Sequence, residues 1–191
     1  MTIKEQKQKI RDEMRRLRHS FGQNFREDAS RRITVGVLSL PEVQSARMFF
    51  VYVSMTDEVS THALIRTLLG QRKVVAIPFV TDDGRMIQRH LTHWAQLTKD
   101  RRGFLTVSHS NILHESPEIC ITPGLAFCPN GTRLGSGGGH FDRYFQHHRS
   151  AWRIALAHEA QLVPVLPVEA HDRKIHVIVT EQRIRVCAAR A

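Results

Sequence analysis

The amino-acid sequence predicts an α/β protein with a mostly parallel central sheet. Three observations lead to this prediction. Residues 47–79 have the order strand, helix, strand, and segments of helical periodicity lie near both ends of the chain. The length of 191 residues suits one well-buried domain, and neither a linker nor an internal repeat divides it. We therefore expect a single domain spanning residues 1–191.

Two helices are expected before the first strand. Apolar residues recur at helical spacing near the N-terminus, at Ile10, Met14, Leu17 and Phe21. Beside this apolar face runs a basic strip, made of Lys7, Arg11, Arg15 and Arg18. The strip is either a solvated flank or a face that presents cations to a ligand, and its spacing leaves both open. A second helix is expected from about Asp28 to Leu38, before Pro41.

The strand–helix–strand unit begins with RMFFVYVS (47–54), whose β-branched and aromatic residues predict a buried strand. Ser60 or Thr61 can cap the helix HALIRTLLG that follows, and Gly70 can close it. KVVAIPF (73–79) is the second strand. This order predicts parallel pairing through a right-handed crossover.

The pattern weakens between residues 81 and 115, where RMIQRHL (85–91) is a candidate for one further strand. EICITPGLAF (118–127) is an apolar run that ends at the turn CPNG. A helix from about 139 to 148 and the strands WRIALA and KIHVIVT complete the chain. Together these elements predict a three-layer, Rossmann-like fold with helices on both faces of the sheet.

About half of the net charge of +10 comes from the first 32 residues, which hold ten Lys and Arg against five Asp and Glu, and the rest is scattered along the chain. Such a balance is typical of nucleic-acid binding, but it fits an anionic small molecule such as a nucleotide or a polycarboxylate equally well. There is no dense basic tract, and few aromatic residues are available to stack on bases. Charge alone leaves the two classes open.

Several features indicate a cytoplasmic protein. No apolar run approaches the roughly 20 residues needed to span a bilayer. The charged N-terminus lacks the apolar core of a signal peptide. Cys120, Cys128 and Cys187 are odd in number and have no metal-ligand spacing, which indicates reduced thiols.

The segment RLGSGGGHFDRYF (133–145) predicts a phosphate site. Its glycines lie between an apolar strand and a helix, where successive N–H groups and the helix N-terminus can converge on an anion. Arg133 adds forked donors suited to phosphate oxygens, and Asp142 is placed to hold a phosphate-bound Mg²⁺. The alternative is a tight or flexible strand-to-helix turn, and these two charged residues favour the phosphate site.

The two common phosphate-binding motifs and two common catalytic motifs are absent from the sequence. G-x-x-x-x-G-K-[ST] is absent because no Lys-Ser or Lys-Thr follows the glycines, and G-x-G-x-x-G is absent because His140 replaces its third glycine. Leu134 stands where the nucleophile elbow G-x-S-x-G requires glycine. His158-Glu159 lacks the second histidine of H-E-x-x-H, which argues against a zinc hydrolase.

The glycine segment in its wider context, PGLAFCPNGTRLGSGGGHFDRYF, resembles the 5-formyltetrahydrofolate cyclo-ligase (methenyltetrahydrofolate synthetase) family. KQKIR with MRRLR is similar to the basic N-terminal helix of that family, and SMTDEVST to its folate-contacting segment. LPVEAHD with VIVT is similar to the C-terminal end. The resemblance therefore covers nearly the whole chain.

The resemblance implies a role for each matching position. Lys7 and Arg11 would contact ATP, and Arg133 would also act in catalysis. The triphosphate would be wrapped by Arg133, Leu134, Gly135, Ser136, Gly137, Gly138, Gly139, His140 and Phe141. Asp142 would bind Mg²⁺, with Asp172 as a second metal ligand. Met55, Glu58 and Phe141 would line the folate site.

Two positions depart from the family pattern. The family has Tyr-Tyr-Asp or Phe-Tyr-Asp where this chain has His140-Phe141-Asp142, so Phe141 lacks a phenolic hydroxyl. The mid-chain segment RGFLTVSHS lacks the Glu-Pro of the family, so no role is transferred to it from the family. Phe104 is the candidate there for an apolar contact to the substrate.

The implied reaction converts 5-formyltetrahydrofolate and ATP into 5,10-methenyltetrahydrofolate, ADP and phosphate. ATP and folate would be the only partners of a monomer, with Mg²⁺ as cofactor and with neither nucleic acid nor membrane bound. The alternatives are a catalytically degenerate relative that binds ATP and folate, and a basic regulator that binds nucleic acid. A nucleic-acid binder would show a steep salt dependence of binding, and it leaves the glycine segment and Asp142 unexplained.

Overall fold

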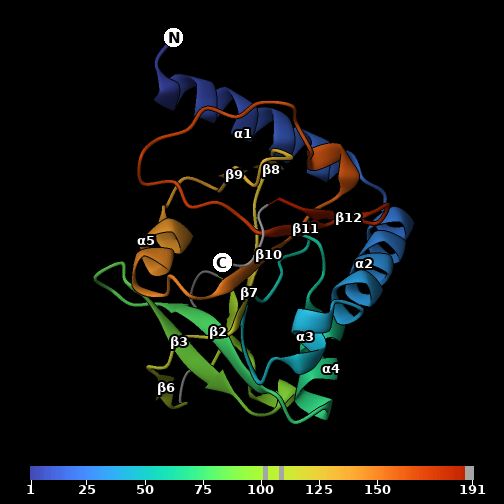
Figure 1. The fold of residues 1–191 in the computed structure, drawn as a ribbon, viewed down its shortest axis with the longest axis vertical. Helices are drawn as coiled ribbons and strands as arrows, with labels where there is room; N and C mark the ends of the chain where they lie inside the picture. The colour runs from blue at the N-terminus through green and yellow to red at the C-terminus, as the bar shows by residue number, and fades with distance from the viewer. Residues whose placement is uncertain (101–102, 108–109, 188–191) are drawn as a thin grey trace.

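The computed structural model describes residues 1–100, 103–107 and 110–187, and these form a central eight-stranded sheet in the order β12-β11-β10-β7-β1-β2-β3-β6 (Figure 1). The strands of this sheet are β1 (Met48–Val51), β2 (Val74–Val80), β3 (Met86–Leu91), β6 (Ile112–Leu113), β7 (Ile119–Thr122), β10 (Trp152–Leu156), β11 (Val177–Val179) and β12 (Ile184–Val186). The five strands from β11 to β2 are paired in parallel. At the two ends of this order, β12 pairs antiparallel to β11, and β3 and β6 pair antiparallel to β2 and β3, respectively. The predicted mostly parallel α/β sheet is confirmed.

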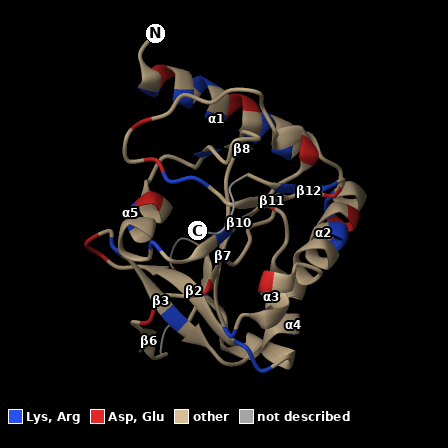
Figure 2. Cartoon of the chain, in the orientation of Figure 1, with Lys and Arg blue, Asp and Glu red and all other residues tan. Residues whose placement is uncertain are grey.

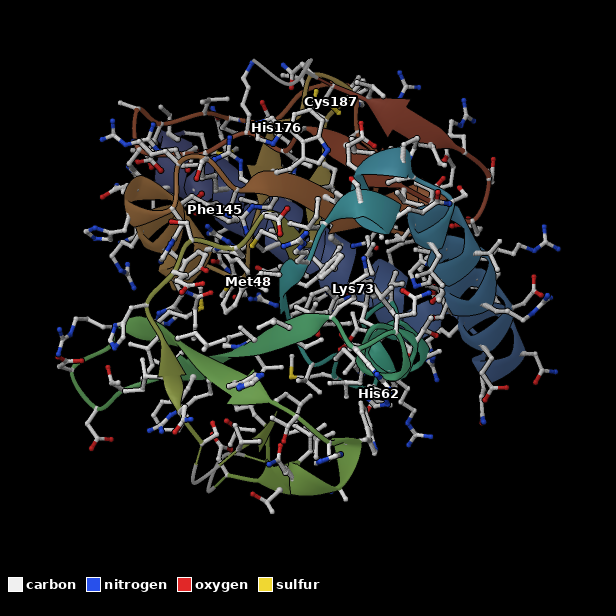
Figure 3. All side chains as sticks on the ribbon, turned by 60° about the horizontal axis from the view of Figure 1, so that its bottom comes forward. Met48, His62, Lys73, Phe145, His176 and Cys187 are labelled. Atoms are coloured by element: carbon white, nitrogen blue, oxygen red, sulfur yellow. The ribbon has the colours of Figure 1, made fainter. Side chains whose placement is uncertain are left out.

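Helices cover both faces of the sheet (Figure 1). They are α1 (Ile3–Ser20), α2 (Gln23–Leu38), α3 (Pro41–Ser45), α4 (His62–Gly70) and α5 (His140–His147), with 3₁₀ turns η1 (Trp94–Gln96) and η2 (Glu159–Gln161). Successive side chains of β1 point to opposite faces, as the pleat requires. Phe49 packs in the cluster with α2 and α4, whereas Phe50 packs with Tyr144 and Phe145 of α5. Phe145 points from α5 into this second layer (Figure 3).

The N-terminal helix α1 packs across one end of the sheet, over the hairpin of β8 (Ala126–Phe127) and β9 (Arg133–Leu134) (Figure 1). Its predicted apolar residues Ile10 and Met14 contact a cluster that contains Ala126 and Leu134. Thr2 and Glu5 form a capping box that starts the helix. Since α1 lies on the hairpin that leads into the glycine segment, its register positions the basic strip beside the glycines.

Several local predictions need correction. The second helix begins at Gln23 rather than near Asp28. The apolar run 118–127 is two strands, because Pro123-Gly124 ends β7 and lets the chain leave the sheet to form β8. Thr61 occupies the N-cap of α4, but its hydroxyl donates to the Tyr52 carbonyl instead of capping the helix. Gly70 is the last residue of α4 rather than the residue beyond it.

Smaller features complete the fold. The candidate strand at 85–91 is β3, antiparallel to β2. A short ladder of β4 (Thr98–Lys99) and β5 (Leu105–Thr106) lies in the mid-chain segment, of which residues 101–102 and 108–109 are outside the described part. The three cysteines are unpaired, and Cys187 lies beside His176 (Figure 3). Within the described residues, no helix is both long and apolar enough to cross a membrane.

Candidate functional site

A cleft of about 390 Å³ opens at the carboxyl ends of three parallel strands, where open α/β sheets bind ligands. Residues at or just beyond the ends of β1, β2 and β7 line it, together with α1 and the glycine segment. They include Arg15, Arg18, Met55, Asp57, Glu58, Pro78, Val80, Pro123, Arg133, Ser136, His140, Phe141 and Asp142. The cleft thus joins the three segments that the sequence singled out: the basic strip, the loop after β1 and the glycine segment.

A second pocket of about 270 Å³ lies on the other side of the glycine segment. It is lined by Lys4, Lys7, Arg11, Arg133, Leu134, Gly135, Gly137, Gly139, Asp142, Glu169, His171 and Asp172. The two pockets share four residues, which are Arg133, Gly135, Gly139 and Asp142. The two pockets therefore meet at these four residues.

The glycine segment has the backbone geometry that the sequence predicts. Gly137 and Gly139 have φ of 113° and 65°, values that residues other than glycine rarely adopt. Gly139 is the N-cap of α5, so the positive end of that helix faces the pocket. A Cβ on Gly137 would lie 3.6 Å from the Arg11 guanidinium, so the backbone and this cation are in close contact.

The basic strip of α1 reaches the glycine segment, so it is not merely a solvated flank. Arg11 Nε donates to the Gly135 carbonyl at 3.0 Å, and Arg15 donates to the Ser136 carbonyl at 3.3 Å. Figure 2 shows Lys and Arg interleaved with Asp and Glu along α1. The helix therefore packs by its apolar face and presents its cations to the loop.

Arg133 and Asp142 form a buried ion pair where the two pockets meet. Arg133 Nη2 lies 2.8 Å from Asp142 Oδ1, and the Arg133 side chain is 3% exposed. The same guanidinium donates to the Pro123 carbonyl, and the Arg173 backbone N–H donates to Asp142 at 3.2 Å. Phe141 lies next to this pair, with the Arg133 guanidinium 5.6 Å from the centre of its ring. Packing and hydrogen bonds thus fix the orientation of both charged groups before any ligand binds.

Lys7, itself buried, forms ion pairs in the 270 Å³ pocket with the partly buried Asp172 and the more exposed Glu169. Its Nζ lies 2.6 Å from Asp172 Oδ2 and 2.8 Å from Glu169 Oε2. Burial acts to lower the pKa of Lys7, but hydrogen bonds from its ammonium to the two carboxylates outweigh burial and raise the pKa. Although burial alone would raise the pKa of Asp172, the hydrogen bond from Lys7 leaves that pKa below its usual value.

Asp172 belongs to a cluster with the donor set of a cation site. Among the described residues, Glu169, His171 and Asp172 bring one ligand atom each to within 4.8 Å of one another. Carboxylate oxygens are the ligands that Mg²⁺ prefers. Asp142 lines the same pocket but lies outside this cluster. Glu169 and His171 were not predicted as site residues from the sequence, although both belong to the motif EAHD that contains Asp172.

The loop after β1 holds Met55 and Glu58 together at the other end of the cleft. The Met55 backbone N–H donates to Glu58 Oε2 at 3.0 Å. Burial raises the pKa of Glu58. Arg18 of α1 secures the loop through an ion pair to Asp57 at 2.5 Å. Arg18 had no role predicted from the sequence beyond its place in the basic strip, and Asp57 was not predicted at all, since nothing local in the sequence pairs them.

A third cavity, of about 620 Å³, lies beyond Met55 and Glu58 and shares these two residues with the 390 Å³ cleft. Arg26, Lys99, Phe104 and Leu105 are among its lining residues. The structure therefore places Phe104 at this cavity and not beside the glycine segment. A molecule that reached from the cleft into this cavity would pass Met55 and Glu58.

The sequence model of the 5-formyltetrahydrofolate cyclo-ligase family matches residues 3–181, which is most of the chain. The chain belongs to the 5-formyltetrahydrofolate cyclo-ligase family. Among curated members, the chain is similar to the 5-formyltetrahydrofolate cyclo-ligase of Haemophilus influenzae, with 32% identity over 177 residues, 88% of this chain and 94% of that protein. The Mus musculus protein of the same name is 26% identical over 200 aligned positions, covering 95% and 96% of the two chains.

The fold agrees with a solved member of the family. The solution structure of 5,10-methenyltetrahydrofolate synthetase from Aquifex aeolicus matches with a TM-score of 0.86 at 24% identity, over 97% of this chain and 95% of that one. The cyclo-ligase fold is thereby shown for this chain.

Proposed function

We propose that the chain, acting as one domain, is a cyclo-ligase that converts 5-formyltetrahydrofolate and ATP into 5,10-methenyltetrahydrofolate, ADP and phosphate. The formyl oxygen is a poor leaving group, so it first accepts the γ-phosphoryl group of ATP. N10 of the same folate then attacks the formyl carbon, a five-membered ring closes, and the oxygen departs with the phosphate. Because both reacting centres belong to one molecule, the protein chiefly positions them and neutralises charge.

The observation that carries this proposal is the junction of the two pockets at Arg133, Asp142 and the glycine segment. ATP in the 270 Å³ pocket would direct its γ-phosphate toward this junction. The formyl group of folate in the 390 Å³ cleft would approach the junction from the other side. Phosphoryl transfer needs this arrangement, with donor and acceptor oxygens on opposite sides of one site.

On the nucleotide side, the roles follow from charge and position. Lys7 and Arg11 line the 270 Å³ pocket together with Leu134, Gly135, Gly137 and Gly139, whereas Ser136, Gly138, His140 and Phe141 line the 390 Å³ cleft. The backbone N–H groups of this run and the N-terminus of α5 would surround the phosphates. Arg133 acts in catalysis, since its forked donors can stabilise the charge on the transferring phosphoryl group. Its hydrogen bond to Pro123 and its ion pair to Asp142 hold the guanidinium in position for this role.

Asp142 and Asp172 would hold Mg²⁺ in the nucleotide pocket. The fit is supported by their carboxylate oxygens and by the ammonium of Lys7, which already stands as a cation against Asp172. When bound, Mg²⁺ neutralises charge on the phosphate oxygens. The two carboxylates would hold the ion in the pocket that Gly135, Gly137 and Gly139 also line.

On the folate side, Met55 and Phe141 supply apolar walls, and Glu58 accepts hydrogen bonds from the amino-pteridine. The hydrogen bond from Met55 fixes the Glu58 carboxyl in the loop. The third cavity offers room for the rest of the folate, with Phe104 as an apolar contact. The glutamate tail is anionic, which is consistent with Arg26 and Lys99 at that cavity.

The test is a spectrophotometric assay of the conjugated methenyl product with 5-formyltetrahydrofolate, ATP and Mg²⁺. We expect product only when all three are present. Asp142→Ala should reduce the rate strongly, whereas Asp12→Ala, which removes an exposed acid from α1, should not. If the folded wild-type protein forms no product, the cyclo-ligase proposal is wrong for this chain, and a nucleotide titration would show whether it only binds ligands.

A further inference from the structure

Both candidate metal-binding carboxylates are already paired with basic side chains. Asp172 is held by Lys7 at 2.6 Å, and Asp142 is held by Arg133 at 2.8 Å. All four side chains line the 270 Å³ pocket. The proposed function assigns the two cations to phosphate and the two acids to Mg²⁺. In the structure, however, these four groups bind one another.

Lys7 blocks its carboxylates more completely than Arg133 does. Its ammonium contacts two of the three side chains in the candidate cation cluster, Glu169 and Asp172. The side chains of Lys7 and Asp172 are only 7% and 13% exposed, whereas that of Glu169 is 41% exposed, so the cluster is closed around the Lys7–Asp172 pair and open to solvent at Glu169. Mg²⁺ binds oxygen at about 2.0–2.1 Å. An ion that bound the same two oxygens would be within a few ångströms of the ammonium and strongly repelled by it.

We propose that Lys7 is an internal cation, which occupies the metal site of the nucleotide-free protein and leaves it for the phosphates when ATP binds. The proposal rests on the proposed function, because it needs nucleotide phosphates in the pocket to draw the ammonium away. Lys7 lines that pocket together with Arg11 and the glycine segment, so a phosphate group there lies within reach of its flexible side chain. Divalent metal alone then binds weakly, and metal and nucleotide bind as a unit.

A purely structural ion pair, tying α1 to the segment 169–172, predicts the opposite effect of removing the lysine. Loss of a structural tie would loosen the carboxylates and leave metal affinity unchanged or lower. Loss of an internal cation leaves the negative charges of Glu169 and Asp172 without a positive partner and vacates the position between them for a metal ion. Divalent-cation affinity rises with the number of uncompensated carboxylates. The metal affinity of a Lys7 variant therefore separates the two roles.

The experiment titrates Mn²⁺ alone into nucleotide-free protein and measures free Mn²⁺ by electron paramagnetic resonance. Lys7→Met keeps a long apolar side chain and removes the charge. We expect it to bind Mn²⁺ at least about tenfold more tightly than wild type. The free energy of a tenfold change is small compared with the repulsion energy of two like charges a few ångströms apart. Lys4→Met is the matched control, because Lys4 lines the same pocket but makes no ion pair with Glu169 or Asp172 in the described part of the chain.

Two further measurements locate the effect. Lys7→Met combined with Asp172→Asn should lose the gain in Mn²⁺ affinity, and a non-hydrolysable ATP analogue should raise the affinity of wild type. The proposal is overturned if Lys7→Met binds no more tightly than wild type, if Lys4→Met gains as much, or if the gain survives Asp172→Asn. Circular dichroism checks that each variant is folded, and Lys7→Gln replaces Lys7→Met if the latter is not.

These outcomes are distinguishable from failure of the proposed function. Wild type that forms the methenyl product without a metal gain in Lys7→Met refutes the internal cation alone. A metal gain in Lys7→Met with wild type that forms no product refutes the cyclo-ligase activity alone.

Discussion

The ion pair between Arg18 and Asp57 connects α1 to the loop that carries Met55 and Glu58. The Arg18 side chain is 6% exposed and that of Asp57 is 25% exposed. We predict that Arg18→Met destabilises the protein and also weakens binding of 5-formyltetrahydrofolate, because the loop loses its attachment to α1. In the variant, the Asp57 carboxylate keeps its charge but loses its partner.

The size of the effect follows from the burial of the two groups. Removing one member of a fully buried pair costs about 3–5 kcal/mol, whereas exposed pairs contribute about 0–1 kcal/mol. Asp57 retains some contact with water, so we expect Arg18→Met to cost about 2–3 kcal/mol. Asp57→Asn should cost at least as much, since it leaves the more deeply buried guanidinium without a counter-charge. The double variant should cost less than the sum, with a coupling of about 1–2 kcal/mol.

Urea unfolding measures these free energies, and isothermal titration measures folate binding. Arg15→Met is the control for stability, because Arg15 lies on the same helix but pairs with Asp12 at the surface, with 44% and 53% of the two side chains exposed. It should stay within about 0.5 kcal/mol of wild type. The reasoning is refuted if Arg18→Met is no less stable than Arg15→Met, or if the Arg18 and Asp57 effects are additive.

Three further predictions concern buried positions. His158 is fully buried between Phe21 and Phe25, and burial lowers its pKa from 6.5 to about 4. The free energy of unfolding should therefore be highest above pH ~6.5 and fall by about 2–3 kcal/mol as the pH drops toward 4, because the unfolded chain binds the proton first. Urea unfolding of His158→Leu should show most of this loss removed. A variant that is as acid-sensitive as wild type would contradict the assignment to His158. The raised pKa of Glu58 has the opposite effect on stability, because the folded protein must release this proton as the pH rises above ~4.5. The free energy of unfolding of Glu58→Gln should therefore rise relative to wild type above that pH. A difference between the two proteins that does not change with pH would count against the prediction. Gly131 has φ of 85°, and a Cβ there would lie 2.3 Å from the Ile175 carbonyl oxygen. Gly131→Ala should therefore lower the thermal midpoint by an amount equivalent to about 2 kcal/mol or more. Gly70→Ala is the control, because Gly70 has open space around it, and equal midpoints for the two variants would refute the clash.

Local patterns in the sequence were sufficient for the main elements and for the phosphate loop. The unit from β1 through α4 to β2 is encoded by short apolar strands around a helical segment, and the parallel pairing of Met48 with Val74 follows from it. The glycine segment was equally predictable, because the positive φ at Gly137 and Gly139 depends on the residue type at each position and not on distant contacts. At Thr61 a tertiary contact overrides the local preference, because its hydroxyl binds the Tyr52 carbonyl instead of capping α4. The break between β7 and β8, by contrast, follows from the local pair Pro123-Gly124.

The long-range charge pairs were decided by the tertiary structure alone. Lys7 and Asp172 are 165 positions apart in the chain, and Arg18 and Asp57 are 39 apart. A sequence lists the available cations and carboxylates without saying which of them meet, since long side chains have many partners of similar affinity within reach. The packing of α1 on the β8–β9 hairpin selects among them. The sequence by itself therefore determined the chemical groups of the site, whereas the burial of α1 decided which of those groups neutralise one another.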